Sequence, residues 1–210
     1  MRDETKVRGN QARSEEIDIA INLTGITKND RTEIFLKRVA PIQVNFLGYP
    51  GTSGAKSIDY IVADKNLISH DTKKFYSEKI IFLPNSYQPN TKNTKISNKK
   101  LTKDKLGLPS EKFIFCCFNQ HQKINPFIYD IWMRILKKNS ESILWLLDDN
   151  FYSNKNLLFE AEKRGVSKSR IFFAKRVPLE DHLERIKFGD LFLDTFPYTA
   201  HTTCSDALRV

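Results

Sequence analysis

The stretch LFLDTFPYTAHTTCSDAL, residues 191–208, decides the fold that we expect for this chain. It opens with an apolar run typical of a buried strand, continues through small and hydroxylated residues, and reads as the start of a helix near Thr202. The first turn of a helix can bind an anion, because several backbone N–H groups lack partners there and the helix dipole adds roughly half a positive charge. In an open parallel sheet, such a loop lies at the carboxyl edge of the strands, where ligands bind. The stretch therefore predicts an anion-binding loop between a strand and a helix.

Strand and helix patterns alternate through the second half of the chain. Asn125 followed by Pro126 is a typical helix start, and apolar residues recur after it at helical spacing. We expect strands at residues 113–118, 143–147, 171–174 and 191–193, and helices at residues 126–136, 156–164 and 178–188. This alternation predicts a parallel, right-handed, doubly wound sheet.

The first half of the chain carries a second set of strand patterns. Residues 48–54 are small and rich in glycine, which predicts a flexible loop where the backbone can approach a ligand closely, although a simple turn explains the same residues. We expect strands at residues 17–23, 42–47, 58–62 and 79–83, and a helix at residues 31–37. These elements predict one end of an α/β unit whose beginning is missing.

The charge of the chain is strongly basic. It has 34 Lys and Arg against 25 Asp and Glu, a net charge of +9, and much of the excess lies in residues 91–105. A surface that binds single-stranded nucleic acid combines basic side chains with stacking aromatic rings, and this stretch has no aromatic residue. A solvated linker is therefore the better interpretation, and we expect no nucleic-acid partner.

Composition and missing motifs exclude other classes. No apolar run approaches the roughly 18 residues of a membrane helix, and no apolar signal segment follows Met1, so we expect a cytoplasmic protein without a membrane partner. The cysteines at positions 116, 117 and 204 have neither zinc-site nor redox-pair spacing. The glycine motifs of dinucleotide-dependent dehydrogenases and P-loop NTPases are absent.

Three further segments carry a resemblance to a known family. They are APIQ at residues 40–43 leading into LGYPGTSG at 47–54, YSEK at 76–79, and CFNQHQKI at 117–124. Together with residues 193–208, these segments resemble the O-linked N-acetylglucosamine transferase family, glycosyltransferase family 41, in the family's own order. Members of that family transfer a sugar from a nucleotide donor to Ser and Thr residues of proteins.

The resemblance implies an incomplete GT-B-like α/β fold, in which two Rossmann-like domains face a cleft. Residues 1–16 would be a disordered or partial lead-in, 17–90 the C-terminal portion of the N-terminal catalytic domain, 91–106 the lysine-rich linker, and 107–210 a truncated nucleotide-sugar-binding domain. Tetratricopeptide repeats and further catalytic segments would lie in the full-length protein. We therefore expect this 210-residue chain to be inactive by itself.

The implied reaction is an inverting transfer of N-acetylglucosamine from UDP-GlcNAc to Ser or Thr of an acceptor protein. No metal or other cofactor is expected, and the residues Asp148, Asp149 and Asn150 read as a turn rather than as the Asp-x-Asp motif of metal-dependent transferases. A related protein O-glycosyltransferase that uses another UDP-hexose, or a non-catalytic remnant, remains an alternative.

The resemblance also assigns roles to residues of the second domain. Lys123 matches the catalytic lysine, and an ammonium there would stabilise the charge that grows on the leaving diphosphate. Gln120 would bind phosphate or sugar, and His182 matches a histidine that lies by the nucleotide. The ordinary alternatives are a surface lysine, an unremarkable loop glutamine and a histidine packed at the edge of the core.

The remaining candidates lie at the predicted helix start and in the glycine loop. His201, Thr202 and Thr203 would bring backbone N–H groups and two hydroxyls to the diphosphate. Asp206, one turn later, would accept hydrogen bonds from the ribose, although N-capping explains the same residue types. In the N-terminal domain, the resemblance places Leu47 and Gly48 beside the sugar and phosphates.

Overall fold

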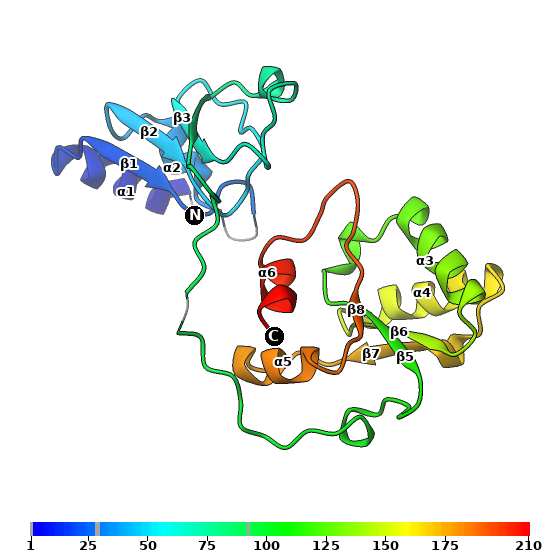
Figure 1. Cartoon of the computed structure of the whole chain (residues 1–210). Helices are drawn as coiled ribbons and strands as arrows, with labels where there is room; N and C mark the ends of the chain where they lie inside the picture. Colours follow the sequence, from blue (N-terminus) through cyan, green and yellow to red (C-terminus); the bar gives the residue numbers. More distant parts are fainter. Residues whose placement is uncertain (1, 28–29, 92) are drawn as a thin grey trace. The chain divides into compact units, whose positions relative to one another are not determined.

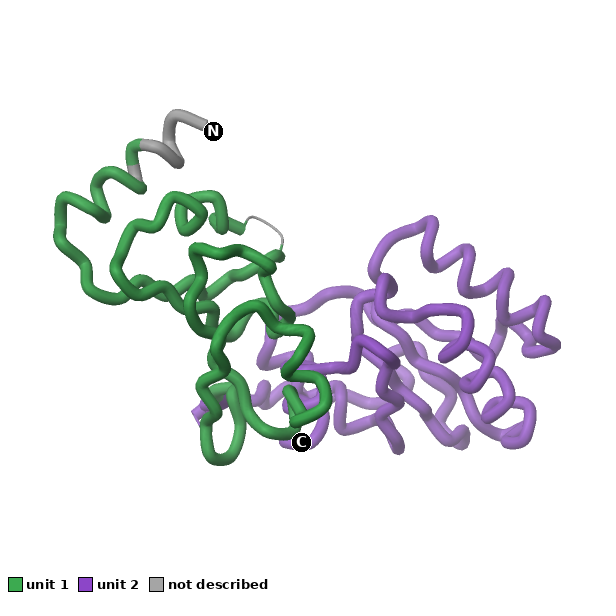
Figure 2. The backbone as a smooth tube through the Cα atoms, turned by 90° about the horizontal axis from the view of Figure 1, so that it is seen from above, with its two compact units in different colours: residues 1–89 green, residues 90–210 purple. Residues whose placement is uncertain are grey.

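A computed structural model describes residues 2–27, 30–91 and 93–210. The chain divides into two compact units, residues 1–89 and residues 90–210, which Figure 2 shows in different colours. The lysine-rich stretch at residues 91–106 belongs to the second unit.

The first unit is built on a four-stranded parallel sheet whose strands follow one another in sequence order. Its strands are β1 (Ile19–Asn22), β2 (Ile42–Asn45), β3 (Tyr60–Ala63) and β4 (Lys79–Phe82), with helices α1 (Arg2–Ser14) and α2 (Thr32–Leu36) and a short 3-10 turn η1 (Lys73–Phe75). All four strands and helix α2 lie where the sequence pattern predicts them. A small apolar cluster of Ile61, Ala63 and Ile68 packs beside the sheet.

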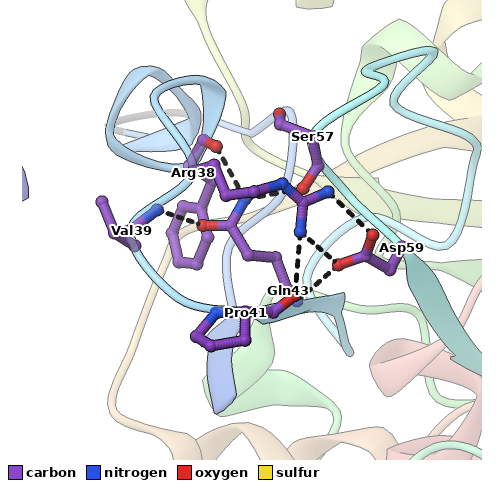
Figure 3. A network of polar contacts seen from close by, with 7 residues as sticks. Arg38, Val39, Pro41, Gln43, Ser57 and Asp59 are labelled. Atoms are coloured by element: carbon purple, nitrogen blue, oxygen red, sulfur yellow. Dashed lines mark hydrogen bonds and ion pairs between the residues drawn. The ribbon is translucent and has the colours of Figure 1, made fainter. Parts of the chain in front are cut away.

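A buried glutamine holds the start of strand β2 in place (Figure 3). The side chain of Gln43 is fully buried; its oxygen accepts from the N–H of Val39 at 2.8 Å, and its amide nitrogen donates to the carbonyls of Phe35 and Ser57. The carboxylate of Asp59 accepts from the backbone N–H of Gln43 at 2.9 Å. Each polar atom of the Gln43 amide thus has a partner, as burial of a polar group requires.

An ion pair closes this network at its outer edge (Figure 3). Arg38 donates from both terminal nitrogens to Asp59, at 2.8 and 2.9 Å, and also to the carbonyl of Pro41 at 3.0 Å. The paired guanidinium lowers the pKa of the Asp59 carboxyl. The APIQ segment is therefore fixed from both sides of its proline.

The N-terminal segment departs from the expectation of a disordered or partial lead-in, because residues 2–14 form helix α1. The segment is polar and has no apolar stripe, so its sequence carries no periodic signal. What holds its C-terminal end is a side chain: Arg13 donates to the backbone carbonyls of Lys37 and Arg38. The helix thus depends on tertiary contacts that the sequence pattern does not reveal.

The second unit contains a four-stranded parallel sheet with the strand order β7–β6–β5–β8 (Figure 1). Its strands are β5 (Phe113–Cys117), β6 (Ser142–Leu147), β7 (Ile171–Ala174) and β8 (Leu191–Phe192). The first strand along the chain, β5, lies inside the sheet and the last, β8, is added on its other side. This order places a topological switch point between β5 and β8, as in doubly wound dinucleotide-binding folds.

The second unit also contains helices and short 3-10 turns, most of which connect its strands. They are η2 (Asp104–Leu106), η3 (His121–Lys123), α3 (Pro126–Lys138), α4 (Phe151–Lys163), η4 (Lys168–Arg170), α5 (Leu179–Ile186) and α6 (Thr202–Arg209). The Asn125 side chain caps α3 by accepting from the N–H of Ile128 at 3.0 Å, as the sequence predicts. Helix α4 begins earlier than predicted, because Asn150 caps it by accepting from the N–H of Ser153 at 2.9 Å.

Apolar clusters cover both faces of this sheet. One cluster contains Trp132, Met133 and Leu136 of α3 and Leu144 and Leu146 of β6. The other, on the opposite face, contains strand residues that alternate with those of the first, together with Ile186 of α5. Strand β6 is buried along its whole length, which is typical of a central strand of a parallel sheet.

The lysine-rich stretch makes specific contacts with helix α5. The N–H of Ser97 donates to the carbonyl of Glu180 at 3.1 Å, and Lys99 forms an ion pair with Asp181 at 2.7 Å. The stretch is polar and largely exposed, but it is attached to the second unit at these points.

Candidate functional site

The candidate site is built on the carboxyl ends of β5 and β8. Phe115 pairs with Leu191 and Cys116 with Phe192, and the N–H of Leu193 continues the ladder by donating to the carbonyl of Cys116 at 2.8 Å. The loops that follow the two strands, residues 118–125 and 193–201, therefore leave the sheet side by side. This is the switch point at which ligands bind in open α/β sheets.

Lys123 reaches from the first loop to the second. It is the last residue of η3, and its ammonium donates to the carbonyl of Thr199 at 3.0 Å and lies 3.9 Å from the centroid of the Tyr198 ring. Partial burial lowers the pKa of Lys123, while the charge of Asp194 acts in the opposite direction. The structure thus holds this ammonium against the segment that leads into helix α6, as the sequence predicts.

Asp194 shapes the second loop. One of its carboxylate oxygens accepts from the N–H groups of Thr195 and Ala200, each at 2.7 Å. The hydroxyl of Thr195 donates to the carbonyl of Tyr198 at 2.7 Å, and Asn125 donates to the carbonyl of Phe196 at 2.6 Å. These bonds return the chain toward β5 before the next helix starts.

Helix α6 begins at the candidate residues His201, Thr202 and Thr203. His201 occupies the N-cap position without a side-chain capping bond, so the threonines stand in the first turn rather than at the cap. Burial is the main cause that lowers the pKa of His201, and the charge of Lys123 adds to it. A neutral histidine and the N–H groups of a first turn thus stand next to the lysine, an arrangement suited to a dianion.

Thr203 is also joined to strand β5. Its hydroxyl donates to the side-chain oxygen of Asn119, which lies in the loop just after β5. The same asparagine donates from its nitrogen to Thr195 at 2.9 Å and to Asp194 at 3.3 Å. Asn119 therefore ties together both loops and the first turn of α6.

Two predicted contact residues lie at the periphery of these loops. Gln120 is exposed at the start of η3 and accepts from the side chain of Gln122 at 3.0 Å. Asp206 is half-buried on α6, and burial raises the pKa of its carboxyl while Arg209 opposes the rise. Gln120 thus borders the turn that carries Lys123, and Asp206 lies on the helix that carries Thr203.

His182 lies on α5 and packs edge-on against Phe118, with ring centroids 5.0 Å apart. Arg185, which is buried, donates from Nε to Nδ1 of His182 at 3.0 Å. Burial, reinforced by the Arg185 charge, lowers the pKa of His182 to about 4. The imidazole is therefore neutral at pH 7, and it is tied to Phe118 at the carboxyl end of β5.

The glycine loop of the first unit is held more firmly than its composition suggests. Leu47 has a left-handed backbone with φ of 78°, and a Cβ at Gly48 would lie 2.4 Å from the carbonyl oxygen of Thr24. Such strain in a non-glycine residue is uncommon and is found preferentially at ligand-binding positions. The flexible loop that glycine content predicts is thus a constrained backbone at Leu47 and Gly48.

A buried carboxylate fixes the far side of that loop. Glu78 accepts from the hydroxyl of Thr52 at 2.6 Å, from the N–H of Ser53 at 2.7 Å, and from the hydroxyls of Ser53 and Ser77. Burial alone would raise the pKa of Glu78, but these hydrogen bonds outweigh burial and lower it. The YSEK and LGYPGTSG segments, distant in sequence, therefore form one structure.

Sequence reasoning missed Asn119, Asp194 and Arg185 as parts of the site. Asn119 and Asp194 each follow a strand, which is the signal that could have pointed to them. Arg185 follows His182 by three residues, so helical spacing places the two on one face.

The residues 148–150 form a capped turn, in which Asp149 pairs with Arg176 at 3.0 Å and Asp148 accepts from Asn154 at 2.6 Å.

Among the helices of the described residues, none is both long enough and apolar enough to cross a bilayer. The cysteines at positions 116, 117 and 204 are all free thiols.

Comparison with known proteins gives consistent matches over nearly the whole chain. A model of glycosyl transferase family 41 matches residues 4–94 and 88–210. A probable UDP-N-acetylglucosamine–peptide N-acetylglucosaminyltransferase, SEC, from Arabidopsis thaliana is 39% identical over 199 residues, which cover 92% of this chain and 20% of that protein. The UDP-N-acetylglucosamine–peptide N-acetylglucosaminyltransferase of Caenorhabditis elegans is 25% identical and covers 91% of this chain and 26% of its own length. The chain thus spans about a fifth to a quarter of these relatives.

Solved structures agree with this result. A mutant O-GlcNAc transferase of Thermobaculum terrenum matches with a TM-score of 0.82 and 27% identity, over 97% of this chain and 38% of that one. The pneumococcal O-GlcNAc transferase GtfA, solved with UDP and GlcNAc, matches with a TM-score of 0.56 at 10% identity, over 98% of this chain and 43% of that one, and shows the fold alone. The predicted GT-B-like α/β fold is confirmed.

Proposed function

The chain belongs to glycosyl transferase family 41, and from this premise we propose that it is part of an enzyme that transfers N-acetylglucosamine from UDP-GlcNAc to Ser or Thr residues of proteins. One observation supports the proposal most directly. The ammonium of Lys123 is bonded to the Thr199 carbonyl, immediately before the first turn of α6, so one cation and several backbone N–H groups stand at one switch point.

The chemistry follows from the charge of the leaving group. When the bond between the sugar and UDP breaks, negative charge grows on the diphosphate, and groups fixed around that charge stabilise the transition state more than the ground state. We assign this role to Lys123, with the N–H groups of the first turn of α6 on the other side of the diphosphate. The proposed reaction needs no metal, because these groups supply the positive charge.

The other residues would orient the donor. Asp206 would accept from the ribose hydroxyls, Gln120 would bind phosphate or sugar, and His182 would lie by the nucleotide. The neutral His182 that Arg185 maintains fits a contact with an uncharged ring better than one with a phosphate. The roles of Leu47 and Gly48, which lie in the first unit, rest on the family resemblance alone.

Further features of the proposal concern the whole protein. Free cysteine thiols at positions 116, 117 and 204 are typical of a reducing compartment, which supports a cytoplasmic location. The relatives named above are named for peptide acceptors, so we propose a protein acceptor here as well.

Titration calorimetry of the 210-residue chain with UDP and with uridine tests the donor site. We expect UDP to bind more tightly than uridine, and the difference to fall as salt is added, because the diphosphate supplies the charge. Equal affinities for UDP and uridine would contradict a diphosphate site at this switch point. Transfer of labelled N-acetylglucosamine to protein Ser or Thr by the full-length protein tests the reaction itself.

A further inference from the structure

Asn119 is a buried polar residue at the carboxyl edge of the sheet in the second unit. The residue is only 2% exposed, and its side chain bonds to both the loop after β8 and the first turn of α6. A buried carboxamide is stable only when both its ends have partners. Here the nitrogen has Thr195 and Asp194, and the oxygen has Thr203.

The direction of each hydrogen bond follows from the chain of partners. The hydroxyl of Thr195 gives its proton to the carbonyl of Tyr198 at 2.7 Å, so it can only accept from Asn119. The side-chain nitrogen of Asn119 must therefore face Thr195, and its oxygen faces Thr203. A carbonyl oxygen cannot donate, so the hydroxyl proton of Thr203 is the one shared in that bond.

The hydrogen bond to Asn119 limits what the Thr203 hydroxyl can do toward a ligand. A hydroxyl has one proton, and that of Thr203 is already used within the protein. We propose that Asn119 and Thr203 are a positioning pair that sets the first turn of α6 against β5, and that the Thr203 hydroxyl does not donate to the diphosphate. The inference rests on the proposed function for the identity of the anion, but its structural part holds without any ligand.

The pair also connects to the proposed catalytic lysine. Asn119 bonds to Thr195, Thr195 bonds to the carbonyl of Tyr198, and the next carbonyl, that of Thr199, accepts from Lys123. Loss of the Thr203 bond would therefore loosen the segment from residue 194 to residue 204, which includes the partner of the lysine.

Hydrogen exchange of the ligand-free chain, followed by mass spectrometry, tests the structural part. Thr203→Val keeps the shape of the side chain but removes the hydroxyl, and we expect exchange over residues 194–204 to rise at least about tenfold. Thr203→Ser keeps the hydroxyl and should behave as the parent. Asn119→Asp, which loses both donated bonds, should raise exchange over the same residues and serves if Thr203→Val does not fold. Ser110→Ala, an exposed hydroxyl before β5, is the matched control and should change nothing.

Calorimetry with UDP on the same variants tests the functional part. We expect several-fold weaker binding by Thr203→Val and parent-like binding by Thr203→Ser. If Thr203→Val weakened UDP binding while its exchange stayed at the parent level, Thr203 would be a direct phosphate ligand and the inference would be wrong. Parent-like exchange in both Thr203→Val and Asn119→Asp would overturn it as well. A parent chain that does not bind UDP would count against the proposed function, while the exchange comparison would still decide this inference.

Discussion

Arg185 Nε donates to His182 Nδ1 across 3.0 Å, and this bond fixes the state of the histidine. Because the arginine can only donate, Nδ1 must carry a lone pair, and the single proton of the neutral ring is on Nε2. His182 is thus a neutral donor through Nε2, and any ligand group that it meets there must be an acceptor.

This pair predicts how stability depends on pH. The pKa of His182 is about 4 in the folded chain, against an ordinary value of 6.5, so between these values the unfolded chain binds more protons than the folded one. The free energy of unfolding should therefore fall as pH drops from 6.5 to 4, by about 1–2 kcal/mol from this residue once its partial exposure to solvent is taken into account. Urea unfolding at pH 7 and pH 5 measures the change.

His182→Asn is the matched variant for that measurement, because it keeps a polar acceptor near Arg185 but does not titrate. Its stability should depend less steeply on pH than that of the parent. Burial also lowers the pKa of His121 and His201, so part of the slope should remain in the variant. Identical slopes in parent and variant would show that His182 is not held neutral.

Lys123→Met should weaken UDP binding by about 10- to 100-fold, the range expected for loss of a charge-assisted hydrogen bond of about 1.5–3 kcal/mol. Uridine binding should stay unchanged, because uridine has no phosphate. Calorimetry with both ligands makes the comparison, and Lys138→Met, an exposed lysine at the end of α3, is the control. A similar loss of uridine affinity would mean that the variant distorts the site.

Glu78→Gln should destabilise the first unit by about 1–3 kcal/mol, because the new amide hydrogens would face the N–H and hydroxyl groups that now donate to Glu78. Thermal or urea unfolding measures the loss. Glu33→Gln removes an exposed carboxylate of the same unit and should leave stability nearly unchanged. Equal behaviour of the two variants would rule out Glu78 as the residue that holds the glycine loop.

Gly48→Ala and Gly9→Ala should change stability in opposite directions. A Cβ at Gly48 would lie 2.4 Å and 2.6 Å from the carbonyl oxygens of Thr24 and Leu23, a clash with backbone that we expect to cost about 1–3 kcal/mol. At Gly9, within α1, a Cβ would lie 3.6 Å from Val39, an ordinary contact distance among the described residues, so alanine should stabilise the helix by about 0.5–1 kcal/mol. Unfolding curves of both variants test the pair; a neutral Gly48→Ala would disprove the close approach.

The sequence predicts the strands of both units well, because each strand is a short apolar run bounded by polar or turn residues. It predicts α3 from the Asn125 cap, but places the start of α4 too late. The first turn of α4 carries two aromatic residues, Phe151 and Tyr152, that are exposed rather than packed, and the polar residues after them show no apolar periodicity. The sequence pattern does not predict helix α1 for a related reason, because the helix is held by Arg13 rather than by an apolar face.

The candidate site divides in the same way. The location of Lys123 beside residues 198–201 follows from two strands that end at one edge, which the pattern of elements predicts. The role of Asn119 could not be predicted, because its partners lie 75 or more positions further along the chain and depend on the register of β5 against β8. The bond between Glu78 and Ser53 likewise depends on tertiary structure alone.

The sheet of the second unit is joined unevenly. Strand β5 shares five residue pairs with β6 but only two with β8, and the proposed donor site straddles that shorter seam. Local unfolding should begin where the fewest hydrogen bonds between strands must break, so we expect the β5–β8 pair to open before the β5–β6 pair. A diphosphate bound by the loops after both strands would add a further connection between β5 and β8. Ligand binding would therefore stabilise the strand pair on which the site is built.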